Sequence, residues 1–351
     1  MVHHQSLGWQ PQNTWVFVVG LLEWKDEDMW SSFPQENRRD AMLVEFFGAS
    51  GVPEGQITYL QDRQATTRRI QEQLDVQLPK AGPNDLLVLY YCGHGWRKDD
   101  GSAYFASYDA DAEDNPGWSM DSLPKVIEQR FSGSRALLLA DCCHSGCLAE
   151  VCAASNGRVA FACLASSLAS ELSTGNWTFT ETLLAGLSGH AFVDTDGSDQ
   201  ITLRELADQI VESMAFAEEQ IARFATSPRF DADIVLAGAR PRPDPRVGQR
   251  VAARSGDTWY RAHIVDVRDG GVKVHYYGYE ESDDEWLGVD QVRTVARPAY
   301  PVGAAVQVQW KQRWFPATVL DARFGIHHIT YEGFGPEWNE WVALKRIRPL
   351  V

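Results

Sequence analysis

Long apolar segments are missing from this chain of 351 residues, which nowhere reaches the run of about 18 consecutive apolar residues that a membrane helix needs. Its first residues, MVHHQSLGWQPQNTW, also lack the basic and then apolar pattern of a secretory signal. Cysteine is scarce, and all six cysteines lie between residues 92 and 163. A disulfide framework would spread them more widely. These absences predict a cytoplasmic protein with free thiols and no membrane contact.

Basic residues are in deficit over most of the chain. Residues 1–240 contain 17 Lys and Arg against 34 Asp and Glu, whereas residues 241–351 contain 15 against 14. The whole chain has a formal charge of −16. Such a surface repels a phosphate backbone and attracts basic polypeptide. We therefore expect a protein partner and no nucleic acid.

A proline-rich segment separates two parts of different pattern. GARPRPDPR, residues 238–246, alternates proline with charge and predicts a stiff, extended linker, because it cannot continue a helix or a central strand. We place one domain before it, at residues 1–237. After it, a pattern repeats at an offset of 55 residues, which predicts two small all-β domains at residues 247–297 and 302–351.

Before the linker, short apolar runs alternate with helical patterns. The strand-like runs are TWVFVVGLL (14–22), QITYL (56–60), DLLVLYYC (85–92), RALLLA (135–140) and RVAFACLA (158–165). Helical spacing covers residues 36–49, 66–78 and 120–130. Apolar strands joined through helices indicate an α/β fold with a mainly parallel sheet between helices. In such sheets, sites form beyond the carboxyl ends of the strands.

Two turns that follow predicted strands carry reactive side chains. CGHG places His94 between two glycines, and DCCHSG places Cys143 just past the next strand. A thiol needs a neighbouring base to become a thiolate near neutral pH, and adjacent strand ends can supply both groups. A zinc site is one alternative, although a second pair of ligands is missing. A core histidine with inert buried thiols is another, and Cys142 is the best candidate for such a thiol.

These motifs resemble those of the caspase and metacaspase superfamily of cysteine peptidases, of the bacterial caspase-like kind. DCCHSG is close to the metacaspase DSCHSG, and LASSLASELS, FTETLLAGL and DTDGSDQITLREL follow in order. The resemblance implies that His94 is the base and Cys143 the nucleophile. It also implies an oxyanion hole made by the backbone N–H groups of Gly95 and Cys143. The expected role is regulated proteolysis in bacterial antiviral defence or programmed cell death.

The resemblance further implies cleavage after Arg or Lys. Caspases that cut after Asp have Gln two positions before the nucleophile, whereas this chain has Asp141, as metacaspases do. ENRRDAMLVEFF resembles the metacaspase NDA segment, so Asp40 becomes a second acidic wall of the substrate pocket, with Cys92 nearby. Two carboxylates around one guanidinium suit bidentate binding. The alternatives are a structural turn acid at Asp141 and an ordinary helix-surface charge at Asp40.

This chemistry requires no cofactor. The family resemblance, however, also implies that a calcium-binding site is to be considered. One acidic pattern occupies EF-hand positions: Asp194, Asp196, Ser198 and Glu205. Asp199 stands where the sharp-turn glycine belongs, so we favour a hairpin that leads into a helix. A different calcium site, implied by the resemblance, would use Asp109 and Glu150. Activity without calcium is an equal alternative.

Each repeat has, in order, Val-Gly, two aromatic residues followed by x-Ala, a Tyr before a Gly, and an acidic residue before Trp. This order resembles that of Tudor, Agenet and chromo-barrel modules, which are small SH3-like barrels. In such modules an aromatic cage holds a methylated cation. The candidates for such cages are Trp259 and Tyr279 in the first repeat, and Trp314 and Phe334 in the second. Burial in a small core is the alternative for these rings. Recognition of an unmodified protein segment or a partner subunit is another use of the barrels.

The sequence therefore predicts a cysteine endopeptidase that cleaves a protein substrate after Arg or Lys, with repeats that recruit a substrate or partner. The alternative is an inactive caspase-like scaffold whose barrels act as a binding module. Within the linker, Arg240 and Arg242 each precede a proline, whereas Arg246 precedes Val247. Because proline after the cut fits poorly in most protease sites, any self-cleavage is expected at Arg246.

Overall fold

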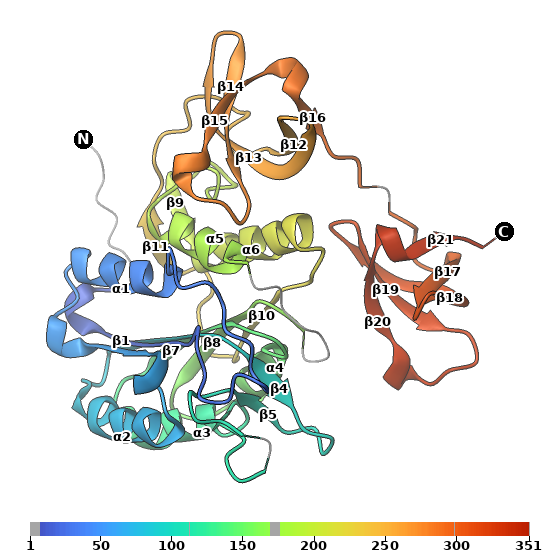
Figure 1. Cartoon of the computed structure of the whole chain (residues 1–351). Coiled ribbons are helices and arrows are strands. Elements are labelled where there is room, and N and C mark those ends of the chain that lie inside the picture. Colours follow the sequence, from blue (N-terminus) through green and yellow to red (C-terminus); the bar gives the residue numbers. More distant parts are fainter. Residues whose placement is uncertain (1–7, 112, 169–175, 298, 351) are drawn as a thin grey trace. The chain divides into compact units, whose positions relative to one another are not determined.

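The computed structural model describes residues 8–111, 113–168, 176–297 and 299–350 (Figure 1). The chain divides into two compact units, Met1–Ile210 with Ala222–Pro241 and Val211–Ile221 with Arg242–Val351. Among the described residues, no helix combines the length and apolar character that a membrane crossing requires.

A six-stranded sheet forms the centre of the first unit, in the order β10-β8-β7-β3-β1-β2. Its strands are β1 (Thr14–Gly20), β2 (Ile57–Gln61), β3 (Leu86–Cys92), β7 (Arg135–Asp141), β8 (Ala160–Ala165) and β10 (Arg223–Thr226). The first five pair in parallel, and β10 is antiparallel to β8. All five strands predicted from the sequence are therefore present, and the mainly parallel sheet is confirmed.

Helices cover both faces of this sheet, with α1 and α5 on one face and α2 and α3 on the other (Figure 1). The helices of the chain are α1 (Arg39–Ala49), α2 (Thr67–Gln77), α3 (Leu123–Arg130), α4 (Gly146–Ala154), α5 (Thr178–Leu187) and α6 (Leu203–Ala217). Every residue of β1 and β3 is buried. Burial on both faces explains why these strands are continuously apolar rather than alternating.

Short strands complete the first unit. They are β4 (Gly95–Arg97), β5 (Ala103–Phe105), β6 (Trp118–Ser119), β9 (Gln200–Thr202) and β11 (Val235–Gly238). The first three form a small antiparallel sheet directly after the turn that contains His94. The remaining two pair with each other. The acidic stretch that resembles an EF-hand loop leads through β9 into α6, as expected, but in the described part of the chain β9 pairs with the distant β11 and forms no hairpin of its own.

The second unit contains two curled antiparallel sheets of five strands each, which we call the first and second half-barrels. The first has β12 (Arg250–Ser255), β13 (Thr258–Arg268), β14 (Gly271–Tyr276), β15 (Glu285–Gly288) and β16 (Val292–Thr294). The second has β17 (Ala305–Trp310), β18 (Arg313–Arg323), β19 (Ile326–Tyr331), β20 (Glu340–Ala343) and β21 (Ile347–Pro349). Every strand of the second sheet begins and ends 55 residues after its equivalent in the first.

Local details follow the same offset. The long second strand of each sheet has an irregularity in its pairing, between Ile264 and Asp266 and between Val319 and Asp321. In both sheets a tyrosine donates its hydroxyl to a glutamate at 2.6 Å, Tyr276 to Glu285 and Tyr331 to Glu340. Each half-barrel also encloses its own apolar cluster.

The proline-rich segment is not extended throughout. Residues 244–248 form a turn, in which Val247 N–H donates to Asp244 O at 3.0 Å. Arg246 also forms an ion pair with Asp244 at 3.0 Å, and Val247 is buried. Proteases bind extended chain, so this turn makes the Arg246–Val247 bond a poorer cleavage site than the sequence alone suggested.

Candidate active site

The turns after β3 and β7 lie side by side at one edge of the parallel sheet. The two strands are hydrogen-bonded neighbours, with Cys92 paired to Asp141. Beyond the last pair, Gly93 N–H donates to Asp141 O at 3.4 Å. The predicted base and nucleophile follow directly after these strand ends, so the sheet register brings their backbones together.

The ring of His94 lies among three aromatic side chains from the segment after β1. Its centroid is 4.5 Å from that of Trp24, 4.6 Å from Phe33 and 5.6 Å from Trp30. The two indoles are themselves anchored, because each donates its N–H to a backbone carbonyl. This segment therefore fixes the plane of the imidazole.

The Nε2 atom of His94 lies 2.8 Å from the carbonyl oxygen of Ser31. A carbonyl can only accept a hydrogen bond, so Nε2 carries the proton and Nδ1 is left to act as a base. Burial lowers the pKa of His94, although the bond to Ser31 opposes this. The imidazole is therefore neutral near pH 7, as a general base must be. Sequence reasoning missed Ser31 because it acts through its backbone.

Cys143 and Cys142 have different surroundings although they are adjacent. Cys142 is buried, and burial raises its pKa well above the ordinary thiol value, so it remains a protonated thiol. Cys143 is partly exposed. The chain turns sharply after it, since His144 has a φ of 57°, in the left-handed region. Of the two thiols, Cys143 is the one that a substrate can reach.

Gly95 packs directly against the backbone of Cys143. A Cβ atom on Gly95 would lie 2.1 Å from the Cys143 carbonyl oxygen and 3.0 Å from Cys142 Sγ. Only glycine allows so close an approach. The two residues predicted to supply the oxyanion-hole N–H groups, Gly95 and Cys143, are therefore neighbours in space.

The three residues predicted to bind substrate also come together. Gly20, Cys92 and Asp141 pair laterally across β1, β3 and β7, so positions 92 and 141 present their side chains to one face of the sheet. Burial, and then the charges of Asp40 and Asp141, raise the pKa of Cys92 well above its ordinary value. Asp141 is 9% exposed and accepts a hydrogen bond from Thr180 Oγ1 at 2.7 Å.

The carboxylate of Asp40, however, is occupied by residues of this chain. Arg38 donates Nε–H to Oδ1 at 3.1 Å and Nη2–H to Oδ2 at 2.9 Å, and Tyr59 donates its hydroxyl to Oδ2 at 2.7 Å. Asp40 is fully buried, and its Oδ2 would lie 1.6 Å from a Cβ atom on Gly20. The glycine at the end of β1 therefore makes room for this carboxylate.

All five N–H groups of Arg38 have an acceptor. Besides the two bonds to Asp40, they reach the Asp62 carboxylate, the Gln35 side chain and the Gly20 carbonyl oxygen. Burial disfavours the charged form of Arg38, but the hydrogen bond and charge of Asp40 outweigh it and raise the pKa of Arg38. Arg38 thus neutralises Asp40.

One acidic group in the described part of the chain has ligand atoms within 4.8 Å of one another: Asp194, Asp196 and Glu205. Asp194 already accepts the backbone N–H groups of residues 197–199. Glu205 accepts hydrogen bonds from Thr195, in the loop, and from Thr202, directly before α6. These bonds show that Asp194 and Glu205 hold the loop and cap the helix.

The other predicted calcium ligands, Asp109 and Glu150, are not in such a group of the described residues. Asp109 accepts the backbone N–H of Thr67 at 2.8 Å and the hydroxyl of Ser107 at 3.1 Å, and Glu150 is exposed on α4. The thiols and imidazoles considered as zinc ligands form no cluster in the described part of the chain either.

The two tryptophans predicted for aromatic cages each make a cation–π contact with an arginine of the same sheet. Arg293 lies 4.1 Å from the ring centroid of Trp259, and Arg348 lies 4.0 Å from that of Trp314. A methylated cation would have to share a ring that a guanidinium already contacts. The cation–π contact is thus satisfied within each barrel.

The other predicted cage residues belong to different aromatic groups. Tyr279 contacts Tyr260 and Tyr276. In the second sheet, an exposed aromatic cluster contains Trp310, Phe315, Phe334 and Trp338, with neighbouring ring centroids 5.9 to 6.2 Å apart. Three of these rings are between 38% and 48% exposed.

A match to a known family covers part of the first unit. Residues 42–152 match the metacaspase, peptidase C14 domain. The matched segment contains His94, Gly95, Asp141 and Cys143, and Asp40 lies just before it. This match supports a cysteine peptidase family for the first unit. No curated protein matches the chain.

Three solved structures are similar to parts of the chain. A Geobacter sulfurreducens protein is 16% identical over 65% of this chain and 100% of its own, with a TM-score of 0.47. The tandem Agenet domains 3-4 of ADCP1 are 20% identical, over 30% of this chain and 79% of their own, with a TM-score of 0.14. The AGD34 segment of Arabidopsis thaliana AGDP1 is 18% identical, over 30% of this chain and 81% of its own, with a TM-score of 0.15.

Replacing Arg38 by Gln should leave the carboxylates of Asp40 and Asp62 without a counter-ion. Breaking a buried ion pair costs about 3 to 5 kcal/mol, so urea denaturation should show a clear loss in the free energy of unfolding. Millimolar methylguanidinium should restore part of it by filling the vacated position. The control Arg63→Gln removes an exposed ion pair with Glu23 and should leave the midpoint nearly unchanged. An Arg38→Gln protein as stable as the native chain would contradict the assigned network.

Proposed function

We propose that the first unit is a cysteine endopeptidase that cleaves a protein substrate after Arg or Lys. The observation that carries the proposal is the arrangement at the ends of β3 and β7. There, the turn that carries His94 packs against the backbone of Cys143, which is partly exposed. The His94 ring is held by aromatic rings and a backbone carbonyl, and Asp141 is buried two residues before Cys143. The match to the metacaspase peptidase domain supports the same chemistry.

The proposed mechanism begins with proton transfer from Cys143 Sγ to Nδ1 of His94. The thiolate attacks the carbonyl carbon of the scissile bond, and the N–H groups of Gly95 and Cys143 stabilise the oxyanion that forms. His94 then gives its proton to the leaving amine, which leaves a thioester on Cys143. Water hydrolyses this thioester with His94 again acting as the base.

Specificity is proposed to rest mainly on Asp141. Asp40 was expected to be a second acidic wall of the substrate pocket, but its charge is balanced by Arg38 and both its oxygens accept hydrogen bonds from this chain. Asp141 lies two residues before Cys143, accepts a hydrogen bond from Thr180 and keeps a small exposed surface. A guanidinium or ammonium of the substrate would therefore find its counter-charge there.

The barrels are proposed to recruit the substrate or a partner protein. The exposed aromatic cluster of the second sheet supports this role, since contiguous exposed aromatic surface is typical of interaction sites. All six cysteines are free thiols in the structure, which supports action in a reducing compartment such as the cytoplasm. The cellular role that we infer from the family resemblance is limited proteolysis in defence or programmed cell death.

Exchange of each adjacent cysteine for alanine tests the nucleophile. Cys143→Ala should abolish hydrolysis of a fluorogenic Arg peptide, whereas Cys142→Ala should keep most of it, because the Cys142 thiol is buried and protonated. Equal losses from both substitutions would overturn the assignment. A folded native chain with no hydrolysis of any peptide would instead favour the scaffold alternative.

The specificity is tested by Asp141→Asn, which keeps the size of the side chain and removes its charge. The variant should lose roughly 30-fold to 1,000-fold in kcat/KM for an Arg substrate, as expected for about 2 to 4 kcal/mol from a partly desolvated ion pair. Its kcat/KM for the matched citrulline substrate, which is neutral, should change little. A native preference for Asp before the cut would contradict this proposal.

A further inference from the structure

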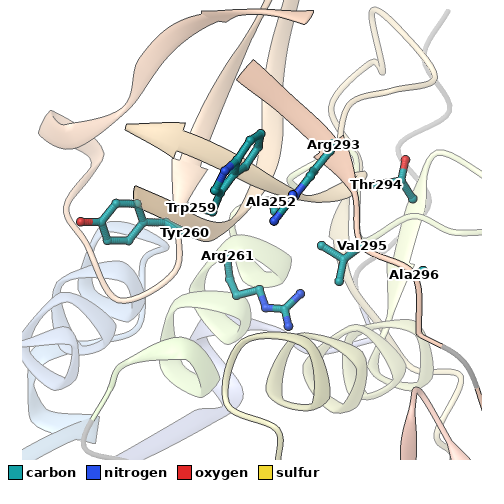
Figure 2. A pocket seen from close by; sticks show the side chains of 8 residues that line it. All are labelled: Ala252, Trp259, Tyr260, Arg261, Arg293, Thr294, Val295 and Ala296. Carbon is teal, nitrogen blue, oxygen red and sulfur yellow. The ribbon is translucent and has the colours of Figure 1, made fainter. Parts of the chain in front are cut away.

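A pocket opens on the first half-barrel of the second unit (Figure 2). Its volume is about 470 Å³, and its wall includes Ala252, Trp259, Arg261, Arg293 and Thr294. Figure 2 shows the side chain of Arg261 extending below the others, while the ring of Tyr260 points to the left, away from the other labelled side chains. No carboxylate is among the described residues of the wall.

The two guanidinium groups of the wall have no acidic partner in the described part of the chain. Arg293 contacts the ring of Trp259 at 4.1 Å, and Arg261 contacts that of Phe216, in the same compact unit, at 4.9 Å. Ring contacts leave the edge of a guanidinium, where its N–H groups point, free to donate. Two positive groups therefore remain unneutralised beside one pocket, in a chain whose formal charge is −16.

The surroundings reinforce this positive charge. Burial, and then the charges of Arg261 and Arg250, lower the pKa of Arg297 to about 10. Arg250 is balanced by Glu212 at 2.8 Å, but no ion pair is found for Arg297 among the described residues. Like charges held close together without counter-ions destabilise a fold unless an anion joins them.

The second half-barrel lacks this feature although it repeats the fold. Its equivalent of the Trp259–Arg293 contact is present, as Trp314 with Arg348. The position equivalent to Arg261, however, is Pro316. The Trp–Arg contact is therefore a shared structural element, whereas the second guanidinium is specific to the first half-barrel. A charge that the repeated fold does not need suggests a ligand.

We propose that this pocket binds a phosphomonoester group, with Arg261 and Arg293 as its ligands. A phosphomonoester carries a charge of about −1.5 to −2 near pH 7, which two guanidinium groups match, and its oxygens accept the paired N–H groups of arginine. The hydroxyl of Thr294 offers a further donor. The phosphate can belong to a phosphorylated side chain of a partner protein or to a small phosphorylated molecule, and neither source depends on peptidase activity.

Isothermal titration of the full chain at constant ionic strength tests the pocket. Three probes are compared: inorganic phosphate, a phosphoserine peptide and the same peptide without phosphate. Phosphate and phosphopeptide should bind, and the unmodified peptide should not. Tighter binding of the phosphopeptide than of inorganic phosphate would identify a protein segment as the source, and equal binding would identify a small molecule.

Variants distinguish the pocket from general attraction to arginine. Arg261→Gln should weaken phosphate binding at least tenfold, and Arg261→Lys, which keeps the charge but not the paired donors, should weaken it less. Arg348→Gln is the matched control in the second half-barrel and should bind like the native chain. Circular dichroism establishes that each variant is folded. Absence of phosphate binding, or an equal loss in Arg348→Gln, would overturn the proposal.

Discussion

The pairing of β3 with β7 is the constraint on which the candidate active site depends. Because these parallel strands end in register, the turns that follow them emerge at the same sheet edge, and Gly95 can pack against the Cys143 backbone. The same register places Asp141 beside Cys92. A shift of one residue would send Asp141 to the opposite face of the sheet from Cys92.

The segment between β1 and α1 packs against the turn after β3. It supplies the aromatic rings around His94 and the Ser31 carbonyl that sets its tautomer, and it ends at Arg38, whose guanidinium joins two carboxylates and the end of β1. The orientation of the His94 ring and the neutralisation of Asp40 are therefore properties of one stretch of chain. A disturbance of the Arg38 network would be expected to reach His94 through this stretch.

Much of this arrangement was predictable from the sequence, because apolar strands followed by Gly-His-Gly or by a reactive cysteine are strong local signals. The strands, their parallel order and the adjacency of the two turns follow from such signals. Ser31 acts through its backbone, and the partner of Arg38 depends on tertiary contacts, so neither had a signal. In the barrels, comparing the two repeats at the 55-residue offset selects aromatic residues that occur in both repeats. It therefore passed over Trp310 and Trp338, which align with Ser255 and Asp283.

The central claim is that the edge formed by β3 and β7 is a peptidase site that selects a basic side chain. The most direct test is the cleavage-site spectrum of the purified full chain on a diverse peptide library, with the Cys143→Ala protein as the blank. We expect cuts after Arg and Lys that are absent from the blank. Cuts confined to positions after Asp, or the same cuts in both samples, would contradict it.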